Sequence, residues 1–158
     1  MRRPELIARS VAAAGVCCIP FAVVLVTAWL WRDVVFGEIA TQWQNDEVST
    51  VAPTWTVLLL PLCGTLICAG VAVVTATELD PLHSRKAYFF AFGIGVMLAI
   101  IWLTVLVPNV LAPDDPSAPA LMLLSPLGLL LGFIPAAIAS LGASRHPTLE
   151  QATPQGEA

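Results

Sequence analysis

Four apolar stretches, each about as long as a helix that crosses a bilayer, make up most of this 158-residue chain. Helices that are apolar on every side suit lipid, where the backbone satisfies its own polar groups and the whole circumference contacts acyl chains or other helices. Only 11% of the residues are charged, whereas soluble domains carry about 25%. None of the stretches contains Asp, Glu, Lys, Arg or His; they run from Val11 to Trp31, Trp55 to Thr77, Tyr88 to Val107 and Leu121 to Gly142.

The fold class predicted from this pattern is all-α, an integral membrane four-helix bundle. We expect one transmembrane domain over residues 11–142, preceded by a tail at 1–10 and followed by a disordered tail at 143–158. Prolines fall inside the predicted helices, where neighbouring helices and hydroxyl groups can compensate for the lost backbone hydrogen bond, so we interpret them as tolerated. They are Pro20, Pro61, Pro126 and Pro135.

The basic residues predict the orientation of the bundle. Arg32 alone lies in an outer connection, and the other six basic residues lie in the tails or between the second and third stretches: Arg2, Arg3, Arg9, Arg85, Lys86 and Arg145. The positive-inside rule then places both termini in the cytoplasm of a multi-pass plasma-membrane protein. One lysine against six arginines hints at a GC-rich bacterial genome. The outer side carries six carboxylates and one arginine, a net charge of minus five: Asp33, Glu38, Asp46, Glu47, Asp114 and Asp115 against Arg32.

Small residues recur at steps of four along each stretch and predict close helix packing, because side chains spaced by four share a helix face. The positions of greatest interest are Gly64, Gly95, Gly128, Gly132 and Ala136. The simpler role for these positions is packing within the chain. The alternative is a homo-oligomer contact along the Gly128-x-x-x-Gly132 face.

Catalytic and metal-binding motifs are absent from the sequence, so we expect no enzyme activity, no cofactor and no metal site. No H-E-x-x-H, G-x-S-x-G or phosphate-binding glycine loop occurs. The four cysteines lie at membrane depth without a histidine or carboxylate beside them, which favours a packing role. Nothing indicates binding to nucleic acid.

The first outer connection, residues 32–54, has the richest pattern. Phe36, Ile39 and Trp43 recur at near-helical spacing, which predicts a partly ordered, re-entrant or interfacial segment against the outer surface. Candidate contact residues in it are Asp33, Glu38, Gln42, Trp43, Asp46 and Glu47.

A family resemblance rests on this connection: Trp31-Arg32-Asp33, then Glu38-Ile39-Ala40-Thr41-x-Trp43, then a polar turn and Ala52-Pro53. Over residues 15–75 the chain resembles a bacterial membrane module of unknown function, which also forms the N-terminal part of immunity proteins against the Sdp killing toxin. Members typically read Leu-Pro-Asp-x-Ile-Pro/Ala-x-His-Trp, followed by Gly-x-x-Asp-Gly. Here Gln42 replaces the family histidine, the group that could titrate near neutrality. The resemblance implies no enzymatic activity.

Three functions are compatible with these features. The first is a non-enzymatic membrane protein of the immunity or signalling kind, whose acidic outer loop contacts another membrane protein or a cationic peptide. The second is an accessory subunit of a larger membrane complex. The third, a transporter or channel component, is the least favoured, because polar solutes need a polar path and the predicted spans contain no charge.

Overall fold

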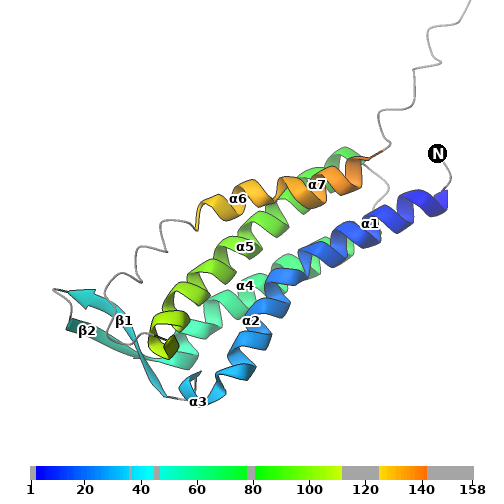
Figure 1. The fold of residues 1–158 in the computed structure, drawn as a ribbon. Coiled ribbons are helices and arrows are strands. Elements are labelled where there is room, and N and C mark those ends of the chain that lie inside the picture. The colour runs from blue at the N-terminus through cyan, green and yellow to red at the C-terminus, as the bar shows by residue number, and fades with distance from the viewer. Residues whose placement is uncertain (1–2, 36, 45–46, 78–80, 112–124, 142–158) are drawn as a thin grey trace, which may run out of the picture.

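The computed structural model describes residues 3–35, 37–44, 47–77, 81–111 and 125–141. The chain is mostly helical, with one β-hairpin at one end of a bundle of long helices (Figure 1). The helices are α1 (Arg3–Cys17), α2 (Ile19–Leu30), α3 (Arg32–Val35), α4 (Thr54–Thr75), α5 (Pro81–Leu111), α6 (Leu127–Leu131) and α7 (Phe133–Ser140), and the strands are β1 (Glu38–Gln44) and β2 (Glu47–Pro53). The tail at 143–158 lies outside the described residues.

Three helical segments are long and apolar enough to cross a membrane: Ile7–Leu30, Thr54–Thr75 and His83–Val110. They correspond to the first three predicted stretches, but two begin earlier. Helix α1 starts at Arg3 instead of Val11, and α5 starts at Pro81 instead of Tyr88. Arg9, Arg85 and Lys86 therefore belong to the helices instead of flanking them.

The fourth stretch is shorter than predicted in the described part of the chain. The apolar segment there is Leu127–Ser140, which at 1.5 Å per residue reaches only about 21 Å, less than the hydrocarbon core of about 30 Å. Ser125 and Pro126 form a turn before it, and the predicted start at residues 121–124 lies outside the described residues. Residues 125–141 therefore form a turn and two short helices instead of the continuous helix predicted over 121–142.

Prolines coincide with two of the helix breaks. Proline has no N–H for the carbonyl four residues earlier, which for Pro20 is Val16 and for Pro135 is Leu131. Helix α1 ends at Cys17, next to Val16, and α6 ends at Leu131. Pro61 and Pro108 instead lie inside continuous helices.

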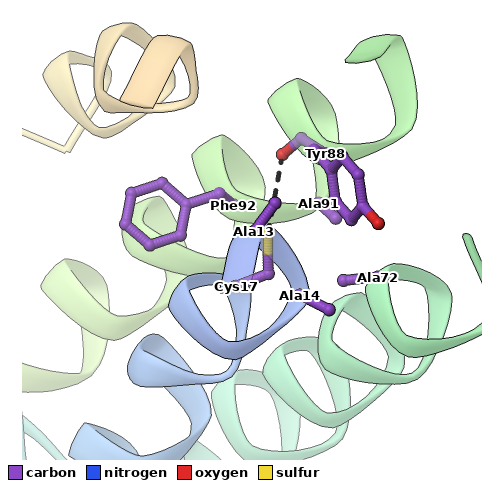
Figure 2. Packing of buried hydrophobic residues seen from close by; sticks show 7 residues of the cluster. All are labelled: Ala13, Ala14, Cys17, Ala72, Tyr88, Ala91 and Phe92. Atoms are coloured by element: carbon purple, nitrogen blue, oxygen red, sulfur yellow. Dashed lines mark hydrogen bonds between the residues drawn. The ribbon is translucent and has the colours of Figure 1, made fainter. Parts of the chain in front are cut away.

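Helix α5 forms the centre of the bundle and contacts α1, α2, α4, α6, α7 and β1. One cluster of buried residues joins α1, α4 and α5 and contains Tyr88 beside Cys17 and several alanines (Figure 2). A second cluster lies towards the hairpin and surrounds Trp102, which is fully buried with Val24, Ala99 and Leu106. The many exposed leucine, isoleucine and valine side chains of α4 point outward, as expected for a helix that faces lipid.

Backbone contacts between α5 and the α6–α7 segment are close because glycines on each segment face the backbone of the other. A Cβ on Gly128 would lie 2.8 Å from the Met97 backbone nitrogen, and a Cβ on Gly132 would collide with the Phe89 carbonyl oxygen. From the other side, a Cβ on Gly93 would meet the Leu129 Cα at 3.1 Å. The G-x-x-x-G face thus packs inside the chain.

The remaining small residues proposed for packing lie in less constrained places. Gly64 of α4 is next to the Leu98 side chain of α5, and a Cβ added at Gly95 of α5 would meet the Pro20 side chain at 3.4 Å. Ala136 is half-buried.

Candidate functional site

Residues 38–53 of the connection between α2 and α4 fold as an antiparallel β-hairpin, so the helical interpretation of their apolar spacing is wrong. Strands β1 and β2 pair from Glu38 with Pro53 to Gln44 with Glu47, with irregularities on either side of Gln42. Ile39 and Trp43 are four residues apart, a spacing that fits a strand as well as a helix because four is a multiple of two. The β-branched content of β2 and the polar Asn45-Asp46 between the strands were the signals for a hairpin.

Asn109, near the C-terminal end of α5, holds the hairpin to the bundle. Its Oδ1 accepts a hydrogen bond from the Ala40 N–H at 2.9 Å, and its Nδ2 donates to the Ala40 carbonyl at 3.0 Å. Nδ2 also donates to the Val105 carbonyl of its own helix at 2.8 Å. The amide side chain therefore occupies the place of a neighbouring strand residue along the β1 edge.

The base of the hairpin is closed at the first residue of α4. Thr54 is fully buried, and both its N–H and its hydroxyl donate to the Gly37 carbonyl, at 3.1 and 2.9 Å. Next to this bond, Ile39 is 1% exposed and fixes the inward face of β1. The hydrogen bonds of Asn109 and Thr54 and the buried side chain of Ile39 thus attach the hairpin to the bundle.

The residues predicted as contacts lie on α3 and on the hairpin, and those whose side chains are described are exposed. Asp33 on α3, and Glu38 and Gln42 on β1, are exposed. The side-chain amide oxygen Oε1 of Gln42 accepts a hydrogen bond from the Thr50 hydroxyl at 3.1 Å. Trp43 and Glu47 lie in the paired strands, where Trp43 pairs with Val48; their side chains, and Asp46 altogether, lie outside the described residues.

Strand β2 pairs with β1 in a two-stranded sheet, and its side chains Val48 and Val51 are about half exposed, at 48% and 51%. This end of the bundle therefore combines the exposed carboxylates of Asp33 and Glu38 with the exposed apolar side chains of Val48 and Val51. The N-terminus and the end of α7 lie at the opposite end (Figure 1).

Three threonine hydroxyls in the long helices donate hydrogen bonds to their own helix. Thr27, Thr65 and Thr104 donate to carbonyls three or four residues earlier. Thr27 also accepts the Trp102 indole N–H at 2.9 Å.

Metal-ligating residues do not gather in the described part of the chain. No group of three or more His, Cys, Asp and Glu side chains there could hold a metal ion. The four cysteines are free thiols.

No family model, no curated protein and no solved structure matches this chain. A function must therefore be inferred from the geometry of the hairpin and of the residues that support it.

Proposed function

We propose that this chain is a non-enzymatic, multi-pass protein of the bacterial plasma membrane, of the immunity or signalling kind, and that its acidic hairpin contacts a cationic peptide or protein outside the cell. Three long apolar helices are compatible with a membrane location. In this proposal α6 and α7 together form the fourth member of the bundle, both termini are cytoplasmic, and the likeness to the Sdp-immunity module reflects a shared role.

The observation that carries the proposal is the rigid attachment of an exposed acidic hairpin. A loop that only connected two spans would need neither the hydrogen bonds between Asn109 and Ala40 nor those between Thr54 and Gly37. Fixing the backbone in advance reduces the entropy lost when a partner binds. Exposed carboxylates on such a scaffold attract cationic partners over long range.

Binding of a fluorescent oligolysine peptide to the protein in neutral lipid nanodiscs tests the proposal. The variant Asp33→Asn/Glu38→Gln removes two hairpin-end charges, and Asp114→Asn/Asp115→Asn removes two charges from the second outer connection. We expect the first pair to weaken binding about three- to tenfold, at about 0.5 kcal/mol or more per exposed charge, and the second pair to have a smaller effect. Equal effects of the two pairs would contradict a specific role of the hairpin.

The orientation is tested in intact cells with a membrane-impermeant thiol reagent. In a background with the four native cysteines replaced by alanine, Gln42→Cys and Lys86→Cys present exposed positions at opposite ends of the bundle. We expect labelling at position 42 only. Labelling at position 86 without labelling at 42 would reverse the proposed topology.

A second candidate function, an accessory subunit of a larger complex, is favoured by the α6–α7 segment. This segment is too short to span the core alone, and it exposes Leu127, Leu130, Leu131, Phe133 and Ile134. Purification from the native host in a mild detergent tests it: a chain that stays free of any partner would argue against this function.

A further inference from the structure

Two half-buried arginines lie at the end of the bundle opposite the hairpin. Arg9 precedes Ser10 on α1, and the Ser10 carbonyl accepts a hydrogen bond from the Tyr88 hydroxyl of α5 at 3.2 Å. Arg85 lies three residues before Tyr88, on the same face of α5 and one turn closer to its start. The contact between Tyr88 and Ser10 therefore brings both arginines to the same end of the α1–α5 pair.

Each of these guanidinium groups has a buried nitrogen with no hydrogen-bond partner: Nη1 of Arg9 and Nε of Arg85. An unpaired N–H on a buried charged group is unfavourable. The two nitrogens lack an acceptor, although the guanidinium groups that carry them are only half-buried.

Carboxylates in the described part of the chain do not supply these acceptors. The acidic side chains that are described, Asp33 and Glu38, belong to α3 and β1 at the hairpin end. Lys86 follows Arg85 in the chain and is exposed. Among the described side chains, this end of the bundle thus carries positive charge without a matching anion.

We propose that Arg9 and Arg85 together bind the phosphate group of an anionic phospholipid at the membrane surface. A phosphate diester offers the oxygen acceptors that match the planar donors of a guanidinium. Both arginines lie near the start of a membrane-length helix, at the depth of the headgroups, where basic pockets between helices bind anionic lipids. The inference depends on the membrane location and not on any role of the hairpin.

Native mass spectrometry of the purified full-length chain tests this site. The protein in neutral detergent is mixed with phosphatidylglycerol and phosphatidylcholine in equal amounts, and the lipids that it retains are counted. We expect wild type to retain phosphatidylglycerol preferentially. The variant Arg9→Gln/Arg85→Gln should bind it about tenfold more weakly or worse, since each lost bond involves a charged group.

The matched control is Arg32→Gln/Lys86→Gln, which removes two positive charges that are exposed. Retention in this control should stay near that of wild type. If the control loses as much lipid as the arginine pair, or if the arginine pair loses none, a built site at Arg9 and Arg85 is wrong.

Two further measurements cover misfolding and the source of the phosphate. If circular dichroism shows that the glutamine pair does not fold, the variant Arg9→Lys/Arg85→Lys replaces it, because it keeps the charges but not the planar donors. This lysine pair should also lose the preference for phosphatidylglycerol. An unchanged preference would overturn the proposal. Excess inorganic phosphate should not displace the lipid, and displacement would show that the site takes free phosphate instead.

Discussion

Asn109 pairs with both backbone polar groups of Ala40, a residue 69 positions earlier in the chain. One side chain thereby acts as a neighbouring strand for β1 and joins the hairpin to the longest helix. This relationship gives the hairpin end of the bundle a fixed shape, which substitutions at the contact should disturb.

Replacing Asn109 should release the hairpin without unfolding the helices. Asn109→Ala removes three hydrogen bonds, two of them to β1, and should lower the free energy of unfolding by about 2–3 kcal/mol. Hydrogen exchange of the backbone amides in β1 should accelerate. Thr50→Val, which removes an exposed hydrogen bond to Gln42, is the control and should change stability by less than about 0.5 kcal/mol. If the exchange rates of the β1 amides are unchanged in Asn109→Ala, the hydrogen bonds of Asn109 do not hold the hairpin.

The buried hydroxyl of Thr54 should matter more than the exposed hydroxyl of Thr56. Both donate to a carbonyl, Thr54 to Gly37 at 2.9 Å and Thr56 to Pro53 at 2.6 Å. Thr54→Val leaves the Gly37 carbonyl with only the Thr54 N–H and should cost about 1–2 kcal/mol, whereas Thr56→Val should cost under about 0.5 kcal/mol because water replaces the bond. Chemical denaturation in detergent micelles compares the two, and equal losses would contradict the role of Thr54 in closing the hairpin base.

The bond between Trp102 and Thr27 should be measurable as a coupling energy. Thr27→Val leaves a buried indole N–H unpaired, while Trp102→Phe removes the donor itself. A double-mutant cycle of these two changes should give a coupling of about 0.6–2 kcal/mol, the range seen for hydrogen bonds between membrane helices. A coupling near zero would mean that the bond adds nothing to the packing of α2 on α5.

Much of this fold could be predicted from the sequence, and the rest failed for physical reasons. The three long spans follow from their composition, because only helices of that length satisfy their backbone in lipid. The helix starts were missed because Arg9 and Arg85 are charged, yet long arginine side chains can extend to the surface from within a helix. The hairpin was missed because the spacing of Ile39 and Trp43 fits both helix and strand. Asn109 appeared in the sequence as one scattered polar residue, since nothing local shows that its partner is Ala40.

Alanine substitutions of glycines should have different effects on stability at close helix contacts and at open positions. A Cβ on Gly132 would collide with the backbone oxygen of Phe89, whereas a Cβ on Gly70 of α4 would meet nothing within 4 Å. Gly132→Ala should therefore destabilise the chain by about 1–3 kcal/mol through overpacking, and Gly70→Ala should be neutral or stabilise it by up to about 1 kcal/mol. Thermal unfolding in detergent measures both. A neutral Gly132→Ala would show that α6 and α7 can move away from α5 at little cost.

The central claim of the proposed function is that the hairpin held by Asn109 is the contact surface for a cationic partner. Its most direct test is a photoreactive oligolysine peptide, cross-linked to the protein in neutral nanodiscs and mapped by mass spectrometry. We expect adducts concentrated between residues 38 and 53, and their loss in Asp33→Asn/Glu38→Gln. Adducts concentrated in residues 112–124, or spread evenly over both ends of the bundle, would contradict this role of the hairpin.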